Sequence, residues 1–189
     1  MKTNNRAFTL IELLVVIAII TILATISVPQ FAKYRVRAYN TVALSDLRNF
    51  KVDLEAYYTD LGNLGYPETL SASQTQGQWM EYTTVTTDLN NDAWNAGLAF
   101  LPSNRVEVYY DASDNLQVYI LGTKHVNGSA VYASTSHTSR IYSQISEDWV
   151  GLSGGGIPGL TMPTVTTGTG DESQNYKDSW FVTNGWTAV

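Results

Sequence analysis

A run of apolar residues near the amino terminus is the feature that most constrains the fold of this chain. From Phe8 to Val28, the only ionisable side chain is that of Glu12. About 20 apolar residues are enough for a helix to cross the hydrocarbon core of a membrane. A carboxylate in hydrocarbon is costly and usually marks a function or a route to water. The sequence therefore predicts one membrane-spanning helix whose single charge needs a partner.

The sequence around this run indicates a retained anchor rather than a secretory signal peptide. A signal peptide would have a shorter apolar region followed by a small-x-small cleavage site. Here the basic head 1–7 leads directly into the long run, which continues into PQFAKYRVRAYN without such a site. We therefore expect the helix to stay attached to the rest of the protein.

The chain beyond Phe50 is acidic and rich in Thr, Ser, Asn and Gly. It holds 5 basic against 15 acidic residues, a balance of −10, whereas the whole chain carries −6. Nucleic-acid binding needs a clustered basic face, so this composition argues against it. The absence of cysteine excludes a disulfide framework and a thiolate metal site. An exported polar domain behind a membrane anchor fits these features.

The residues AFTLIE at 7–12, between a basic leader and the apolar run, resemble the amino terminus of a type IV prepilin or a type II secretion pseudopilin. The resemblance is most specific from Ala7 to Pro29 and extends loosely to about Leu61. In this family, a prepilin peptidase cuts on the cytoplasmic face before the phenylalanine and methylates the new amino terminus. The resemblance implies cleavage between Ala7 and Phe8 and N-methylation of Phe8, with alanine where the family usually has glycine.

By this resemblance, Glu12 acts in filament assembly. When subunits pack together, its carboxylate can lie against the positive amino terminus of a neighbour's Phe8, so that each buried charge is paired. The alternative is a glutamate at the membrane interface, because four residues beyond Phe8 is only about 6 Å along a helix. The complete motif favours the assembly role.

An amphipathic pattern extends the helix beyond the apolar run. Pro29 removes a backbone donor and clashes with the preceding turn, so we expect a kink or local unwinding there. Glycine and proline at 62–67 end the amphipathic pattern. A helix from Phe8 to Leu61 would be about 80 Å long. Charged residues mostly take the other faces of this helix. Its apolar stripe, which should pack on a partner, consists of Tyr39, Ala43, Leu47, Phe50, Leu54, Tyr57 and Leu61.

The pattern over 105–144 predicts an antiparallel sheet of about four strands folded over this stripe. The runs RVEVYY, LQVYILG, SAVYAST and SRIYSQ are rich in β-branched and aromatic residues, with turn sequences between them. Asn127-Gly128 is a strong hairpin signal, because both residues accept positive φ.

These patterns predict an α+β fold in which a long amino-terminal helix, transmembrane in its first half and amphipathic in its second, packs against a four-stranded antiparallel sheet. The resemblance implies that this is the pilin fold. The tail has no cysteine for the disulfide that often closes it in the family, so we expect packing by aromatic residues at 176–186 or a bound ion. The expected segments are a leader that is removed (1–7), a transmembrane or filament-core helix (8–29), an amphipathic half-helix (30–61), a loop region (62–104), the sheet (105–144) and a carboxy-terminal loop region (145–189).

Asp88, Asn90 and Asp92 have the oxygen-ligand spacing that opens a calcium loop. Ala93 stands where glycine should follow, and Ala99 where the closing glutamate should be, so an EF-hand is excluded. A looser calcium site, of the kind that some pseudopilin heads use, competes with a solvated turn. No other cofactor is expected.

The segment 151–155 matches the G-x-S-x-G nucleophile pattern. That pattern needs a strand before the serine, a helix after it and a histidine later in the chain. Here GIPG follows, and His125 and His137 both come earlier. We therefore expect no catalytic serine and no enzymatic activity.

An aromatic series on the expected helix permits two interpretations. It is similar to the series of aromatic-rich pilins that have been proposed to carry electrons along the filament. Tyrosines at helical spacing are far more often packing residues, so packing is favoured over conduction. The series consists of Phe31, Tyr34, Tyr39, Phe50, Tyr57 and Tyr58.

The resemblance implies a structural subunit of a type IV pilus, anchored in the inner membrane by one helix and then assembled into an extracellular filament at the cell surface. Its partners would be copies of itself, the prepilin peptidase and the pilus assembly machinery. A type II secretion pseudopilin is the alternative within the family, and its head generally keeps a calcium loop. A monomeric membrane-anchored binding module is the alternative from a different class.

Overall fold

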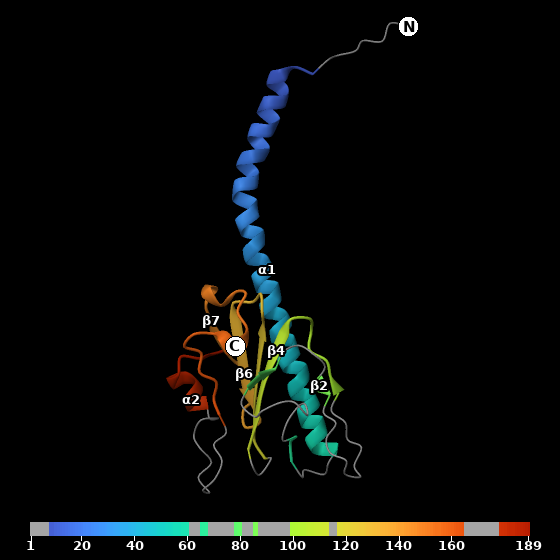
Figure 1. The fold of residues 1–189 in the computed structure, drawn as a ribbon, viewed down its shortest axis with the longest axis vertical. Coiled ribbons are helices and arrows are strands. Elements are labelled where there is room, and N and C mark those ends of the chain that lie inside the picture. The colour runs from blue at the N-terminus through green and yellow to red at the C-terminus, as the bar shows by residue number, and fades with distance from the viewer. Residues whose placement is uncertain are drawn as a thin grey trace, which may run out of the picture. The chain divides into compact units, whose positions relative to one another are not determined.

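A computed structural model describes residues 8–60, 65–67, 78–80, 85–86, 99–113, 117–164 and 178–189. The chain forms two compact units, Met1–Arg35 and Val36–Val189. The long helix α1 (Leu10–Asp60) runs through both, and all the strands belong to the second unit (Figure 1). The predicted combination of a long amino-terminal helix and an antiparallel sheet is confirmed.

In the first unit, α1 is an apolar helix with exposed side chains, and it is long and apolar enough to cross a membrane. Its hydroxyl groups bond back onto the helix: Thr21 Oγ1 donates to the Ile17 carbonyl and Thr25 Oγ1 to the Thr21 carbonyl, each at 2.8 Å. These donors are therefore satisfied in an apolar environment. The helix continues through Pro29 without local unwinding, and the kink there stays a prediction.

The second unit is built on a six-stranded antiparallel sheet in the order β1-β4-β5-β6-β7-β8, and a separate pair joins β2 and β3. The four predicted strands correspond to β4, β5, β6 and β7. The prediction missed the edge strands β1 and β8, which are too short to show an alternating pattern. The strands are β1 (Gln78–Met80), β2 (Val85–Thr86), β3 (Ala99–Phe100), β4 (Val106–Ala112), β5 (Tyr119–His125), β6 (Ala130–Thr135), β7 (Tyr142–Ile145) and β8 (Thr187–Ala188).

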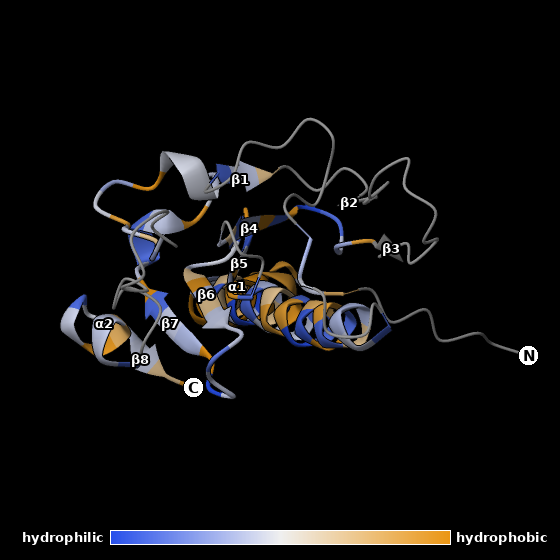
Figure 2. Ribbon diagram, turned by 90° about the horizontal axis from the view of Figure 1, so that it is seen from below, coloured by the Kyte–Doolittle hydropathy of each residue, from blue (hydrophilic) through white to orange (hydrophobic). Residues whose placement is uncertain are grey.

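One face of this sheet packs on α1 (Figure 2). The predicted apolar stripe is confirmed: Ala43, Leu47, Phe50 and Leu54 are fully buried in one cluster with side chains of β4, β5 and β6. Tyr57 packs against the same cluster. Tyr39 stacks on His125 with ring centroids 4.3 Å apart, and Leu61 lies outside the described residues.

The opposite face of the sheet is covered by the carboxy-terminal region, including the short helices η1 (Glu147–Trp149), η2 (Gly154–Gly156) and α2 (Asp178–Thr183). Phe181 stacks on Tyr142 of β7 with ring centroids 4.2 Å apart, and Trp180 and Trp186 contact Phe181 edge-on. The predicted packing of the aromatic tail is confirmed for these residues, and Tyr176 lies outside the described part of the chain. Because both faces are covered, β4, β5 and β6 are buried along their whole lengths.

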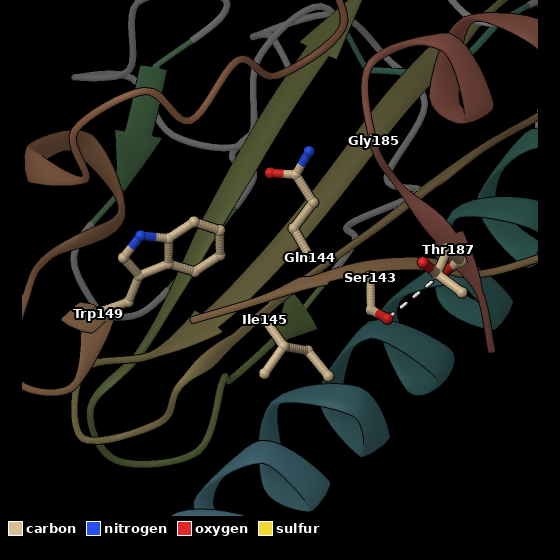
Figure 3. A pocket seen from close by; sticks show the side chains of 6 residues that line it. All are labelled: Ser143, Gln144, Ile145, Trp149, Gly185 and Thr187. Atoms are coloured by element: carbon tan, nitrogen blue, oxygen red, sulfur yellow. Dashed lines mark hydrogen bonds between the residues drawn. The ribbon is translucent and has the colours of Figure 1, made fainter. Parts of the chain in front are cut away.

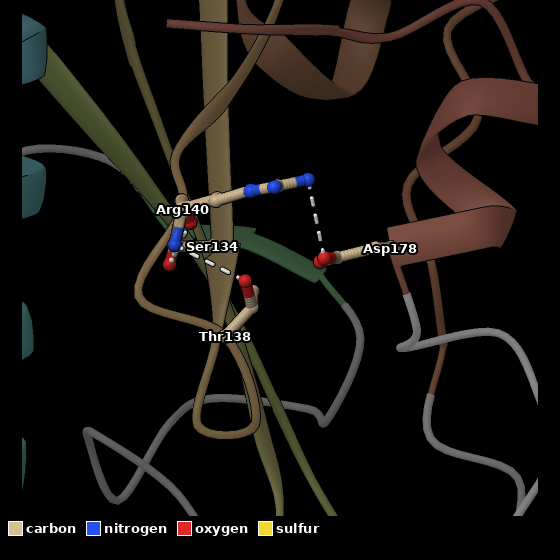
Figure 4. A network of polar contacts seen from close by, with 4 residues as sticks. All are labelled: Ser134, Thr138, Arg140 and Asp178. Carbon is tan, nitrogen blue, oxygen red and sulfur yellow. Dashed lines mark hydrogen bonds and ion pairs between the residues drawn. The ribbon is translucent and has the colours of Figure 1, made fainter.

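The turn between β6 and β7 is held by its own side chains and by α2. Ser134 Oγ donates to the Arg140 carbonyl at 2.9 Å, and the Arg140 amide donates to Thr138 Oγ1 at 3.1 Å. The Arg140 guanidinium forms an ion pair of 3.6 Å with Asp178, the first residue of α2 (Figure 4). Exposed ion pairs contribute little to stability, so the aromatic contacts of α2 are its main attachment to the sheet.

Polar side chains on α1 also reach the sheet and its loops. Asn40 Oδ1 accepts bonds from the amides of Ser129 and Ala130 at 2.9 and 3.1 Å. The buried Asp46 carboxylate accepts the Ser103 amide at 2.8 Å and the Ser103 hydroxyl at 3.0 Å. Further pairs join Lys51 with Ser134, Thr135 and Thr138, and Glu55 with the hydroxyls of Tyr66 and Tyr119.

The hairpin predicted at Asn127-Gly128 is confirmed between β5 and β6, but the predicted turn geometry is wrong. Among the described residues, neither Asn127 nor Gly128 has positive φ. Glycine at 128 is explained instead by a close approach of α1. A Cβ atom there would lie 2.5 Å from Asn40 Oδ1 and 3.1 Å from the His125 carbonyl oxygen.

We expect Gly128→Ala to lower the free energy of unfolding by roughly 1–3 kcal/mol. The added methyl group would displace Asn40 and weaken its bonds to Ser129 and Ala130. Urea denaturation of the full chain in detergent, followed by tryptophan fluorescence, measures the change. Gly156→Ala is the matched control, because nothing lies within 4 Å of a Cβ at that position. Equal midpoints for the two variants would contradict the close-approach explanation.

Candidate functional site

The first turn of α1 holds Glu12 in a local hydrogen-bond network. Thr9, directly before the helix, donates its amide and its hydroxyl to Glu12 Oε2 at 2.8 and 2.7 Å. The Glu12 amide donates in return to Thr9 Oγ1 at 3.3 Å. Threonine before a helix and glutamate three residues later form a capping box, which satisfies amide groups that the first turn leaves unpaired. This network fixes the carboxylate at the start of the helix.

The cap leaves one oxygen of Glu12 available. Both donated bonds end on Oε2, and no donor among the described residues contacts Oε1. A carboxylate can accept bonds on both oxygens. A cation from another molecule could therefore bind Oε1 while Thr9 keeps Oε2. The position also suits a negative charge, because the amino-terminal end of a helix carries a partial positive charge.

The surface around Glu12 is apolar and exposed. Phe8 is 80% exposed, and Leu10, Ile11 and Leu13 are 60% or more exposed. Large contiguous apolar surfaces on a protein mark contacts with other proteins or with lipid. The first turn of α1 thus combines an apolar surface with one carboxylate that can accept a positive charge.

Sequence reasoning missed the role of Thr9. The signal was present as T-x-x-E at the start of an apolar run, which is the pattern of a capping box. The interpretation of Glu12 weighed only an interfacial and an intermolecular role. In the structure, Glu12 Oε2 also binds Thr9 of the same chain, and this bond is compatible with both the interfacial and the intermolecular role.

Two other predicted sites lie wholly or partly outside the described residues. Ala7 of the cleavage site lies outside the described residues, as do Asp88, Asn90 and Asp92 of the possible calcium site. Among the residues that are described, no group of three or more His, Cys, Asp or Glu side chains could hold a metal ion. Calcium binding at 88–92 stays a prediction.

The segment 151–155 has a structural explanation. Ser153 precedes the short helix η2, and an added Cβ at Gly154 would lie 2.4 Å from the ring of Trp79 in β1. The Gly154 amide donates to the Glu107 carboxylate in β4. Glycine is needed here because the backbone packs against an indole ring. The strand before the serine and the α-helix after it, which the nucleophile pattern needs, do not form around this segment.

The aromatic series of α1 divides between exposed and packed residues. Phe31 and Tyr34 are 66% and 61% exposed in the first unit. In the second unit, Phe50 is fully buried, and Tyr58 stacks on Tyr66 with ring centroids 4.7 Å apart. Together with Tyr39 on His125 and Tyr57 against the core, these contacts agree with packing of the helix on the sheet.

Buried charges in the second unit hold turns together. Lys124 is fully buried, and its ammonium group donates to the carbonyls of His125, Val126 and Gly128 at 3.0, 3.3 and 3.4 Å. Burial lowers the pKa of Lys124 to about 8, and the nearby Glu107 carboxylate partly opposes that shift. Burial also lowers the pKa of Lys51, which binds the carbonyls of the β6–β7 turn. Each lysine closes one end of β6.

Comparisons with known proteins concern the same amino-terminal region. Residues 2–28 match the family described as the prokaryotic N-terminal methylation motif. A type IV major pilin protein of Myxococcus xanthus is 39% identical over 57 residues, which are 30% of this chain and 26% of the relative. A fimbrial protein of Pseudomonas aeruginosa is 45% identical over 52 residues, or 28% of this chain and 34% of the relative.

A third relative matches over a longer segment. A type IV major pilin protein of Neisseria gonorrhoeae is 34% identical over 91 residues, which are 45% of this chain and 42% of the relative. The matches to these three relatives thus span between 26% and 42% of the relatives' lengths. The motif and the relatives therefore support the type IV pilin family for this chain, and the helix-and-sheet fold agrees with it.

Proposed function

We propose that this chain is a structural, non-enzymatic subunit of a type IV pilus. The precursor is anchored in the inner membrane by the first half of α1, and the mature chain polymerises into an extracellular filament. The observation that carries this proposal is the exposed apolar surface around a single carboxylate in the first turn of α1, within the N-terminal methylation motif.

Assembly in this proposal depends on a charge pair between subunits. A prepilin peptidase cuts between Ala7 and Phe8, so that Phe8 becomes the methylated, positively charged amino terminus. This group binds Glu12 Oε1 of a neighbouring subunit, while Oε2 stays with Thr9. Pairing removes the cost of burying either charge alone. The apolar side chains from Leu10 to Val28 form the filament core, in which each helix covers its neighbours.

The names of the relatives favour a pilus over a secretion pseudopilus. The three relatives described above are named as type IV major pilins or as a fimbrial protein. The acidic, Thr-rich and Gly-rich second unit suits a surface that faces water along an extracellular fibre. These points support the pilus as the assembly that this subunit builds.

Intact-mass and amino-terminal analysis of material sheared from the cell surface tests the proposal. We expect a chain of 182 residues that begins at N-methylated Phe8, because the motif predicts removal of the first seven of the 189 residues. The same mature chain confined to the membrane would favour a pseudopilin or a minor subunit. A chain that still carries residues 1–7 would mean that Ala7 blocks processing, which would favour the anchored binding module.

A further inference from the structure

A pocket lies at the uncovered end of β7. Pairing between β7 and β8 covers Tyr142 and Ser143 and extends no further along β7. Beyond this point, the edge of β7, η1 and the chain before β8 surround a cavity of about 480 Å³, within the range of about 300–1,000 Å³ for small-molecule sites. Its lining residues are Ser143, Gln144, Ile145, Trp149, Gly185 and Thr187 (Figure 3).

The side chain of Trp149 provides an anchored aromatic surface in this pocket. It is half-buried, and it packs against the aromatic cluster that includes Tyr142 and Phe181. Its backbone is fixed in η1, where the Trp149 amide donates to the Ser146 carbonyl at 3.2 Å and the Ser146 amide donates to the Ser129 carbonyl at 2.9 Å. An indole held in this way contacts a ligand at a small cost in conformational entropy.

Polar groups lie across the pocket from the indole (Figure 3). Gln144 is held by a bond of 2.7 Å from its Nε2 to the Asn184 carbonyl, and no donor among the described residues contacts its Oε1. Ser143 and Thr187 line the pocket from the other face of the sheet, where the Ser143 hydroxyl donates to the Thr187 carbonyl at 3.5 Å. Gly185, with a φ of 78°, brings no side chain to the pocket, and a Cβ there would lie 3.7 Å from Gln144 Nε2.

The described residues that line the pocket carry no charged side chain, and this restricts the chemistry of the ligand. Glu147 and Asp148 precede Trp149 in η1 and would repel an anion. A neutral ligand needs one apolar face for the indole and hydroxyl groups for the amide of Gln144. A pyranose ring has both, because its C–H groups form an apolar face and its hydroxyls project around the rim.

We propose that this pocket binds a neutral saccharide. The apolar face of one pyranose ring lies on Trp149, and its hydroxyls donate to Gln144 Oε1. This binding belongs to the second unit and does not depend on filament assembly. The site would allow the surface of a fibre to hold a glycan.

Saturation-transfer NMR with methyl glycosides of glucose, galactose, mannose and N-acetylglucosamine tests this proposal. The full chain is kept in a zwitterionic detergent, since detergents with sugar headgroups would compete for the site. We expect magnetisation transfer to the ring protons of at least one glycoside, together with a change in tryptophan fluorescence. No transfer to any of the four would overturn the proposal, as would equal binding of the anionic N-acetylneuraminic acid.

Variants assign the binding to the pocket. Trp149→Ala should weaken binding at least tenfold, whereas Trp149→Phe should restore part of it, because a phenyl ring still offers an aromatic face. Gln144→Leu should weaken binding through the loss of the amide. Val150→Ala is the control, because Val150 is exposed beside Trp149 but does not line the pocket. Unchanged binding by Trp149→Ala, with an unchanged urea midpoint, would overturn the assignment.

Discussion

Glu12→Leu should abolish incorporation of the chain into extracellular fibres while the protein stays in the membrane. Leucine is as apolar as its neighbours and preserves membrane insertion, but it offers nothing to the amino group of a neighbour's Phe8. Removing one partner of a buried ion pair costs about 3–5 kcal/mol, because the other charge is left unpaired. This cost would recur at every subunit contact in a filament. The fraction of protein in sheared fibres, compared with the membrane fraction by immunoblot, measures the loss.

Two further variants separate the charge pair from the capping box. Glu12→Gln keeps an oxygen that can accept from Thr9 but removes the charge, so it should also reduce assembly strongly. Thr9→Val keeps the carboxylate but removes the hydroxyl that donates to Oε2 at 2.7 Å. Loss of a helix cap costs about 1 kcal/mol, so we expect Thr9→Val to assemble at a modestly reduced yield. Wild-type fibre yield from Glu12→Leu would favour the monomeric anchored module.

The long helix and the central strands could be predicted from the sequence because their signals are local and periodic. The stripe through Leu47, Phe50 and Leu54 repeats at helical spacing, and these side chains are fully buried against the sheet. The runs that became β4, β5 and β6 are rich in β-branched and aromatic residues, because both of their faces are covered. Sequence patterns reveal an element when its environment is uniform along its length.

Other features depend on contacts between distant segments. Position 128 needs glycine because Asn40, far away in the sequence, lies close to it. Position 154 needs glycine because the ring of Trp79 lies against it. Lys124 and Lys51 resemble surface lysines in the sequence, but they bind turn carbonyls at the two ends of β6. The strand β8 pairs with β7 next to the stack of Phe181, in α2, on Tyr142. The pocket beside Trp149 results from the same arrangement, so no single stretch of sequence indicates it.

The second large expected effect is loss of stability in alkali. Burial raises the pKa of Tyr109, Tyr110 and Tyr119 above the ordinary value of 10.0, and the Glu55 carboxylate beside Tyr119 adds to the shift. Above pH 10, the unfolded chain releases these phenolic protons and the folded chain keeps them. The folded state then binds more protons, so the free energy of unfolding falls as pH rises. Each of these tyrosines removes about 1 kcal/mol per pH unit above 10.

Lys124 and Lys51 change the free energy of unfolding in the opposite direction at lower pH. The pKa of Lys124 is lowered to about 8 from 10.5, so between these values the unfolded chain binds the additional proton. Stability should therefore rise with pH from about 8 towards 10, and the lowered pKa of Lys51 contributes in the same direction. The expected profile increases gently to about pH 10 and then falls steeply.

Urea midpoints of the full chain at pH 7, 9, 10 and 11 measure this profile. The part of the tyrosinate absorbance that belongs to the buried phenols should appear together with the loss of near-ultraviolet circular dichroism, because these phenols ionise only on unfolding. Tyr119→Phe removes one phenol with a raised pKa, so the urea midpoint should fall less steeply above pH 10. It also removes the bond of 2.9 Å to Glu55 and therefore lowers the midpoint at pH 7. The comparison is therefore between slopes and not between midpoints. A midpoint that stays constant from pH 10 to 11 would contradict this prediction, as would tyrosinate absorbance that develops fully before unfolding. Either result would mean that these phenols are open to water. The sheet would then lack the cover that the aromatic tail and α1 provide on its two faces.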